Sequence, residues 1–362
     1  MIIWKSIISP LAILGLIASA SPTLAQKSRD TLRIGFYDPI SIVDATHDPK
    51  PETGLLSRAV YDNLLAYDRK ADKFRPSLAK SWKRIDAKTI EFKLRDDVKF
   101  HDGSEFDADD VVYTINWFAD PKVKFRIKTR YLWIKKAEKI DKYTVRIHSK
   151  RPAAVALARF AISTPIYPSD VHGALKVKST FGKKGIGTGP YMVESVDPNK
   201  GVILKANPSY KHGGPWRPAA RIGRIHVKPI PDVQTQMAQF LTGGLDFMYR
   251  VPKDQLDSMK GNSAFSITTQ KGQLFYYIAM DSIGKSGHPA LKDKRVRKAI
   301  MMAINRDKIK QNLIPGGNDM EQMSAMCQKW QRGCGYTTKP PAYNPGMARK
   351  LLAEAGFPNG FD

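Results

Sequence analysis

Apolar and charged residues alternate strictly over residues 90–95, which is the clearest pattern in the chain. A period of two places the apolar side chains on one face, so this segment predicts a strand that is half buried. Asp102-Gly103 then forms a turn pair. Asp107 is a suitable N-cap for a helix whose apolar residues continue to Ile115. The order predicted here is strand, turn and capped helix.

Strand and helix patterns follow one another along the rest of the chain. Period-two or short apolar runs predict strands at 32–36, 143–147, 190–196, 202–204, 225–227 and 274–280. Helical spacing of apolar residues predicts helices at 55–64, 153–160, 234–241, 296–304 and 345–355. Because strand and helix patterns are mixed along the chain, the predicted fold class is α/β. There is no internal repeat and no low-complexity region.

The N-terminus has the pattern of a secretory signal peptide. Lys5 is the only charged residue in the first 25, and an apolar stretch follows at 7–20. Small residues up to Ala25 suit cleavage before Gln26. The alternative is a membrane anchor, but a helix that spans a bilayer needs about 20 apolar residues. No cysteine follows the apolar stretch, so the sequence predicts a free periplasmic protein rather than a lipid-anchored one.

Cys327 and Cys334 are the two cysteines of the chain. In an oxidising compartment, such a pair predicts a disulfide that closes a small loop. A zinc site is the weaker alternative, because two cysteines with no histidine nearby leave a tetrahedral site incomplete. A redox role would call for a closer pair, such as Cys-x-x-Cys.

The chain is strongly basic, with a formal net charge of +25 over 362 residues. Such an excess of positive charge indicates either that the protein binds an anionic partner or simply that its surface in the periplasm is basic. Lysine and arginine are spread along the sequence, and there is no arginine-rich arm, so a nucleic-acid partner is not expected. The length predicts two or three compact units.

Motifs for catalysis are missing from the sequence. There is no G-x-S-x-G, P-loop or dinucleotide fingerprint, and no two histidines stand at i and i+4. The glycines at 185, 187 and 189 are followed by Pro190 rather than by a helix, which argues against a phosphate cradle. The sequence therefore predicts no enzyme, no cofactor and no metal.

Several motifs, in a fixed order, resemble the extracytoplasmic solute-binding proteins of family 5, which serve peptide and nickel ABC importers. They are VYDNLLAYD (60–68), PSLAKSW (76–82), FKLRDDVKFHDGSEFDADDVVYT (92–114), the segment 187–218, TGGLDF (242–247), and the segments 293–309 and 343–362. The resemblance covers essentially all of the chain after the signal peptide.

The resemblance implies a two-lobed periplasmic binding protein fold of type II with an extra inserted domain. Residues 26–66 and 187–280 would form the first lobe, 67–186 the inserted domain, and 281–362 the start of the second lobe. Closure of the lobes on a small solute, such as an oligopeptide or dipeptide, would create the form that a membrane permease recognises. The protein would act as a monomer, without a covalent step.

Residues in loops that should face the cleft are the candidate ligand contacts. They are Tyr37, Asp38, Arg130, Tyr131, Ser163, Thr164 and Asp281. Each has an alternative interpretation as a solvated loop residue. Trp117 and Trp133 could stack on a ligand, but core packing is the favoured interpretation. The resemblance leaves the ligand open among peptides, nickel chelates, sugars and opines.

The end of the sequence also departs from the family. The helix at 345–355 ends at Gly356, and a turn at 358–360 should lead into a new element. Family members usually continue much further, so we expect a truncated chain whose third domain exposes an apolar surface or an unpaired strand edge. The alternatives to solute binding are a secreted cleft hydrolase or a non-functional truncated fragment.

Overall fold

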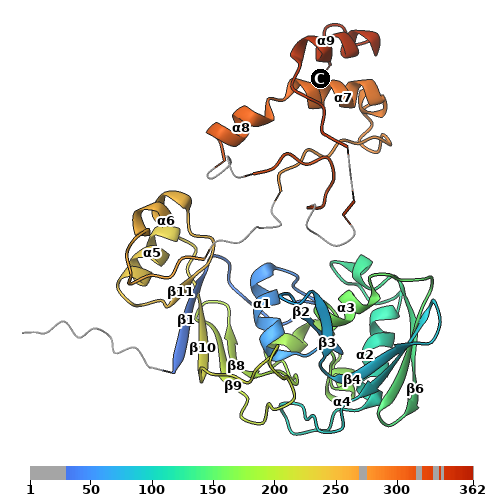
Figure 1. Cartoon of the computed structure of the whole chain (residues 1–362), viewed down its shortest axis with the longest axis vertical. Coiled ribbons are helices and arrows are strands. Elements are labelled where there is room, and N and C mark those ends of the chain that lie inside the picture. Colours follow the sequence, from blue (N-terminus) through green and yellow to red (C-terminus); the bar gives the residue numbers. More distant parts are fainter. Residues whose placement is uncertain (1–29, 269–274, 315–319, 329–333, 336–337, 362) are drawn as a thin grey trace, which may run out of the picture. The chain divides into compact units, whose positions relative to one another are not determined.

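The computed structural model describes residues 30–268, 275–314, 320–328, 334–335 and 338–361. The chain divides into two compact units, Met1–Tyr249 and Arg250–Asp362, and each is treated by itself (Figure 1). The predicted signal peptide, residues 1–25, lies outside the described residues. The signal peptide and its cleavage before Gln26 therefore stay a prediction.

The first unit contains a five-stranded sheet in the order β11-β1-β10-β9-β8 (Figure 1). Its strands are β1 (Thr31–Phe36), β8 (Tyr191–Asp197), β9 (Gly201–Ala206), β10 (Arg224–Pro229) and β11 (Phe247–Met248). β1 runs parallel to β10, with Ile34 opposite Val227, and also parallel to β11. β8 and β9 form the antiparallel hairpin predicted at 190–204.

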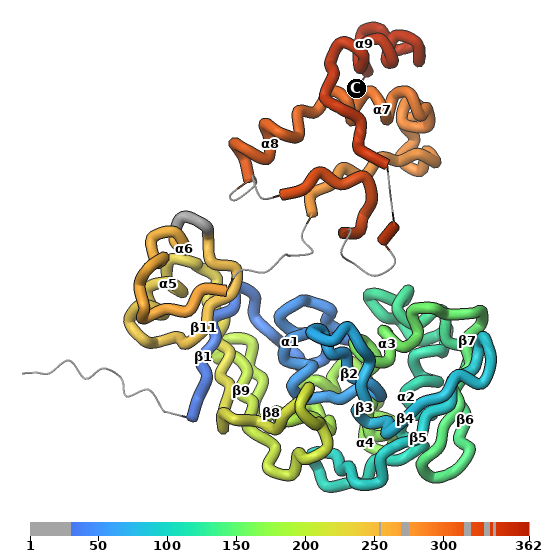
Figure 2. Tube along the Cα trace, viewed as in Figure 1, coloured from blue at the N-terminus to red at the C-terminus, as the bar shows by residue number. Residues whose placement is uncertain are grey.

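A second sheet of the same unit is antiparallel, in the order β4-β5-β7-β6 (Figure 2). Its strands are β4 (Ala79–Arg84), β5 (Thr89–Leu94), β6 (Ile134–Asp141) and β7 (Thr144–Ser149); β2 (Leu65–Asp68) and β3 (Lys73–Pro76) form a separate hairpin. Ile90, Phe92 and Leu94 of β5 are buried, which confirms the pattern of alternation.

Helices cover these sheets. They are α1 (Pro51–Val60), α2 (Ala108–Ala119), α3 (Ala156–Ile162), α4 (Ser169–Ala174) and α5 (Val233–Leu241), with 3-10 turns η1 (Lys128–Arg130) and η2 (Lys178–Lys183). The predicted cap of α2 is confirmed: the Asp107 carboxylate accepts the backbone N–H of Asp109 at 2.8 Å, and Asp110 accepts the N–H of Asp107 at 3.1 Å.

One hydrophobic core joins both sheets of the first unit. It contains Ile34 and Val202 from the five-stranded sheet, and Phe92 and Val145 from the antiparallel sheet. The first lobe and the inserted domain expected from the resemblance therefore share a core. The boundaries at residues 66 and 186 remain a prediction.

Two helices of the first unit differ from the predicted ranges. α1 ends at Val60 instead of continuing to Leu64, because the Val60 carbonyl accepts the backbone N–H of Gly189 at 2.9 Å and the chain turns extended at Tyr61. A Cβ at Gly187 would lie 2.1 Å from the Val60 oxygen, so this glycine permits a close backbone approach. The helix predicted at 153–160 runs instead over Ala156–Ile162, after a tight turn.

The regular elements in the described part of the second unit are helices: α6 (Lys253–Met259), α7 (Lys294–Ala303), α8 (Arg306–Asn312), α9 (Pro345–Glu354) and the turn η3 (Ala290–Lys292). α9 begins after Asn344, whose side-chain oxygen accepts the N–H of Met347 at 2.9 Å and caps the helix. Its apolar face packs on α7 through Ala299, Met302 and Ala348. α9 therefore has a packing partner within the second unit.

The strand predicted at 274–280 does not form over residues 275–280, and Leu274 lies outside the described residues. In the part of the chain that the structure describes, no strand pairs with this segment, so its backbone has no ladder to join. Tyr276, Tyr277 and Ile278 are 60–67% exposed. Other apolar side chains of the second unit are exposed as well, among them Ile283, Leu313 and Met347 of α9.

Cys327 and Cys334 form the predicted disulfide, with their Cα atoms 5.8 Å apart. We expect replacement of both cysteines by serine to lower the free energy of unfolding of the second unit by about 2–3 kcal/mol, because a short loop is no longer closed in the unfolded chain. Urea unfolding followed by circular dichroism measures this loss. A reductant should destabilise the native protein by the same amount and leave the variant unchanged; an equal effect of the reductant on both would contradict the prediction.

Candidate functional site

The carboxyl ends of three parallel strands meet at one edge of the five-stranded sheet. β1, β10 and β11 all run in the same direction, and the N–H of Ile230, just after β10, donates to the carbonyl of Phe36 at 2.7 Å. In open α/β sheets, ligands bind outside the carboxyl ends of the strands. This edge is therefore the first candidate for a binding surface.

Aromatic side chains stand at this edge. Tyr37 follows β1 directly and is 61% exposed, and Asp38 beside it is half-buried. Tyr249 follows β11, and its ring meets that of Phe36 with centroids 6.4 Å apart. The sequence indicates Tyr37 and Asp38 but not Tyr249, whose position two residues after the TGGLDF motif is its only signal.

An ion pair holds β11 in place beside β1. The Asp246 carboxylate accepts two hydrogen bonds from the Arg33 guanidinium, at 3.0 and 3.1 Å, and one from the Arg33 N–H at 2.9 Å. The acidic residue of the TGGLDF turn therefore has a structural role. It fixes the strand that presents Tyr249.

The loop after β1 is anchored by a buried carboxyl group. Asp44 accepts hydrogen bonds from the N–H of Thr46 at 2.8 Å and from the Tyr167 hydroxyl at 2.9 Å. Burial raises the pKa of Asp44 above its ordinary value, and the nearby His47 opposes this effect. The loop that begins with Tyr37 is therefore attached to the core at Asp44, which restrains its conformation.

Tyr131, one of the predicted contacts, is packed in the core of the first unit. Its ring stacks on Phe118 of α2 at 4.2 Å, and its hydroxyl donates to the carbonyl of Ser163 at 3.1 Å. Only 2% of it is exposed, and burial raises the pKa of its phenol to about 12. Tyr131 therefore joins the chain at Arg130 to the end of α3.

Ser163 and Thr164 lie where α3 ends. The N–H of Ser163 and the hydroxyl of Thr164 both donate to the carbonyl of Arg159, each at 3.0 Å. Thr164 is fully buried, whereas Ser163 is half-buried with a buried hydroxyl oxygen that has no hydrogen-bond partner. Thr164 is thus a cap, and Ser163 has spare hydrogen-bonding capacity.

Four of the predicted contacts come together, and three do not. Arg130, Tyr131, Ser163 and Thr164 form one group with Arg159, and the Arg130 guanidinium donates to the carbonyl of Ala45 at 3.5 Å. Tyr37 and Asp38 lie earlier in the loop that contains Ala45. Asp281 belongs to the second unit, where its carboxylate accepts the N–H groups of Ile283 at 3.3 Å and Gly284 at 2.9 Å.

The charge of Arg130 acts on two further arginines, and no ion pair of these three side chains is found among the described residues. We call Arg58 of α1, Arg130 and Arg159 the arginine cluster. Burial lowers the pKa of Arg159, and the charge of Arg130 lowers it further. Burial also lowers the pKa of Arg58, with smaller effects from Arg69, Arg217 and Arg130. Sequence reasoning missed Arg58 and Arg159, because single arginines inside amphipathic helices carry no signal.

The two tryptophans named from the sequence are packed in the fold. Trp117 of α2 meets Phe125 at 5.0 Å and His172 at 4.7 Å between ring centroids. Trp133 donates its indole N–H to the carbonyl of Arg130 at 2.9 Å. Trp133 therefore helps to position the backbone of Arg130. Both tryptophan rings pack against the hydrophobic core, as the favoured interpretation predicted.

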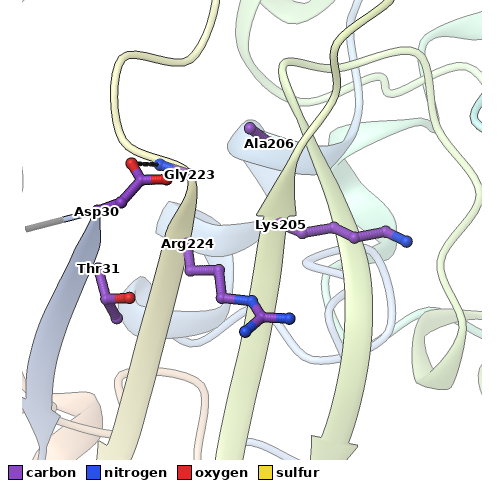
Figure 3. A pocket seen from close by; sticks show the side chains of 6 residues that line it. All are labelled: Asp30, Thr31, Lys205, Ala206, Gly223 and Arg224. Carbon is purple, nitrogen blue, oxygen red and sulfur yellow. Dashed lines mark hydrogen bonds between the residues drawn. The ribbon is translucent and has the colours of Figure 1, made fainter. Parts of the chain in front are cut away.

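A shallow hollow of about 300 Å³ lies at the opposite edge of the sheet (Figure 3). It is lined by Asp30, Thr31, Lys205, Ala206, Gly223 and Arg224. Asp30 accepts the backbone N–H of Gly223, and Arg224 is paired with Glu194 at 2.9 Å. The hollow stands at the amino ends of β1 and β10, and none of the predicted contacts lines it.

Metal ligands do not gather in the described part of the chain, where no group of three or more His, Cys, Asp or Glu side chains could hold an ion. A search of the same residues for membrane spans finds no helix with the length and apolar character needed to cross a bilayer.

The fold is that of the type II periplasmic binding proteins. The oligopeptide-binding protein AppA from Bacillus subtilis, solved with a nonapeptide, is similar over 90% of this chain and 64% of its own, with a TM-score of 0.75 and 26% identity. NikZ from Campylobacter jejuni, solved with Ni(L-His), is similar over 90% and 63%, with a TM-score of 0.71 and 25% identity.

The chain belongs to the bacterial extracellular solute-binding proteins of family 5, since the model of that family's middle region matches residues 73–362. The glutathione-binding protein GsiB of Escherichia coli K12 is 29% identical over 329 residues, covering 87% of this chain and 60% of GsiB. The chain thus spans about 60% of the length of this curated relative.

Proposed function

We propose that this protein is the solute-binding component of an ABC importer, which captures a peptide-like or related small solute and delivers it to a membrane permease. Membership of family 5 over residues 73–362 is the observation that carries this proposal. The exposed Tyr37 at the carboxyl edge of the parallel strands and the arginine cluster supply binding groups of the expected kinds.

The names of the relatives support a solute with a carboxylate. Glutathione, a nonapeptide and nickel-bound histidine are the ligands named for GsiB, AppA and NikZ. All three contain carboxylate groups, whereas they differ in size and metal content. The seven residues predicted from the sequence remain candidate contacts, with Tyr131 and Thr164 acting through packing and capping.

The same proposal covers the setting in which the protein works. We infer that residues 1–25 are removed on export and that the protein acts in the periplasm as a monomer, by binding rather than by catalysis. The apolar stretch at 7–20 and the small residues up to Ala25 support export.

A thermal-shift screen tests the proposed function. The protein is purified from the periplasm of an expression host and heated with glutathione, di- to nonapeptides, nickel–histidine or opines, each over a range of concentrations. A ligand of the native state at about 100 times its Kd adds about 2.7 kcal/mol of stability, a shift of about 5–10 °C. If no solute gives a saturable shift, the proposal fails for this chain.

A further inference from the structure

The segment 185–190 leads from the turn η2 to β8 and is attached to the end of α1. Its sequence is GIGTGP, so it has no titratable side chain of its own. The N–H of Gly189 donates to the carbonyl of Val60 at 2.9 Å, and the hydroxyl of Thr188 donates to the Asp62 carboxylate at 3.0 Å. Both contacts hold one side of the segment.

His101 holds the other side, from the turn 100–104 between β5 and α2. Its backbone N–H donates to the carbonyl of Gly187 at 2.8 Å. On its ring, Nδ1 accepts the N–H of Gly187 at 3.1 Å, and the Nε2–H donates to the carbonyl of Gly189 at 3.0 Å. One histidine therefore fastens this turn to residues that lie 86 and 88 positions further along the chain.

The two backbone partners determine the protonation state of the ring. The N–H of Gly187 can only donate, so Nδ1 must carry a lone pair. The carbonyl of Gly189 can only accept, so Nε2 must carry the hydrogen. His101 is therefore neutral and held in one tautomer. A second proton on Nδ1 would face the N–H of Gly187, and their hydrogen bond would be lost.

The surroundings of the ring keep it neutral. Burial lowers the pKa of His101, and the Gly189 carbonyl with the charges of Asp62 and Asp102 offsets this effect only in part. The charged groups nearby are Asp102 of the same turn, Asp62 after α1, the residues His212 and Arg217 that bind Asp62 from the loop before β10, and the exposed Lys184 before the segment. Since His101 itself is only half-buried, a change of pH in the solvent reaches it.

We propose that His101 is an acid-sensitive latch between the turn 100–104 and the segment 187–189. At neutral pH the ring closes the latch through its two hydrogen bonds. When Nδ1 takes up a proton, the N–H of Gly187 loses its acceptor and the segment opens locally from the turn. The Gly185 carbonyl favours the charged ring, so the new N–H has an acceptor in the same segment.

The direction of the pH effect follows from the lowered pKa of His101. Such a group stabilises the fold above its ordinary value of 6.5, and the contribution is lost as the pH falls from there through the folded value. The latch therefore weakens the connection between residues 67–186 and the five-stranded sheet in acid. It does so whichever solute the protein binds.

Hydrogen exchange followed by mass spectrometry tests the latch on the full chain, at about pH 7.5 and about pH 4. A peptide that covers 184–190 should be protected at the higher pH. After correction for the chemical exchange rate, its Gly187 amide should exchange about 10-fold faster at the lower pH, because one hydrogen bond is lost. A peptide from the β8–β9 hairpin serves as the internal reference and should change much less.

His101→Gln is the decisive variant, because one amide group combines an acceptor and a donor and does not titrate. Its segment should stay protected at both pH values, whereas in His101→Ala it should exchange fast at both. His226→Gln is the matched control: the His226 ring donates to the carbonyl of Lys200 at 3.3 Å, away from the latch, and this variant should keep the native acid response. His101→Asn also offers an acceptor and a donor, and replaces His101→Gln if that variant does not fold.

Two outcomes of these exchange measurements would overturn the proposal. In one, the native segment is equally protected at both pH values, which by itself excludes an acid-sensitive latch. In the other, His101→Gln opens in acid as the native protein does, which assigns the titration to another group. Long-range proton–nitrogen spectra of histidine-labelled protein add a direct check of the ring. A His101 that carries its hydrogen on Nδ1 at neutral pH would contradict the geometry on which the latch depends.

Discussion

We expect Asp62→Asn to lower the free energy of unfolding of the first unit by about 3–5 kcal/mol. The Asp62 carboxylate is fully buried and accepts hydrogen bonds from Arg217, from His212 at 2.9 Å and from Thr188 at 3.0 Å. Arg217 also donates to the carbonyl of Tyr61 at 3.2 Å, at the end of α1. Without the carboxylate charge, a largely buried guanidinium is left uncompensated.

Urea unfolding followed by tryptophan fluorescence measures this loss, since Trp82, Trp117, Trp133 and Trp216 all lie in the described part of the first unit. The exposed pair of Asp96 and Lys80 is the control, and Asp96→Asn should change stability by less than about 1 kcal/mol. The double variant Asp62→Asn/Arg217→Gln should be more stable than Asp62→Asn alone, because no unpaired charge remains. A double variant that is less stable still would refute this explanation.

The same carboxylate makes stability depend on acid pH. Burial alone would raise the pKa of Asp62, but the charge of Arg217 and the hydrogen bond from His212 outweigh it and hold the pKa at about 2. A depressed pKa stabilises the fold above the unfolded value near 3.8, and this contribution is lost as the pH falls from about 4 through 2. Asp62→Asn should lack this part of the pH dependence.

Local patterns were enough to predict the elements that contain their own signals. β5 follows from alternation, α2 from Asp107 and its capping box, and α9 from Asn344 followed by proline. In each case the decisive contacts lie within a few residues of one another. The disulfide is similar, because the two cysteines are separated by only seven positions.

Long-range contacts explain what the sequence could not predict. The end of α1 at Val60 depends on Gly189, which is far away in the chain. The segment 275–280 has strand composition, but composition cannot supply a neighbouring strand. The arginine cluster joins α1, the turn η1 and α3, and no local pattern marks Arg58 or Arg159 as neighbours of Arg130.

Phe92→Ala is the second substitution from which we expect a large effect, a loss of about 3–5 kcal/mol. Phe92 is fully buried in the middle of β5, opposite Trp82 of β4 and Val145 of β7. Its ring meets Phe160 of α3 edge to face, with centroids 5.2 Å apart. Alanine would leave a cavity between the antiparallel sheet and the helix that bears Arg159.

Ile85→Ala provides the comparison, because Ile85 is 45% exposed and its truncation should cost no more than about 0.5 kcal/mol. Phe92→Leu should lie between the two, since most of the buried apolar volume is kept. Chemical unfolding of the three variants under one set of conditions gives the ranking. A cost for Phe92→Ala as small as that for Ile85→Ala would show that the site collapses around the missing ring.

The Phe92→Ala variant also tests whether residues 67–186 form a domain of their own. Trp82, Trp117 and Trp133 report on that region. Trp216 does not report on the chain after it alone, because its indole N–H donates to the carbonyl of Pro76 at 3.0 Å. A Tyr191→Trp substitution in β8, combined with Trp216→Phe, places a reporter in the five-stranded sheet. Because one core joins the two sheets, a cavity at Phe92 should lower the stability sensed by both sets of reporters together. Phenylalanine replacements of the tryptophans, one set at a time, separate the signals. If the region around Trp82 unfolds first while the reporter in β8 keeps its native signal, the inserted domain is an independent folding unit and the shared core does not couple them.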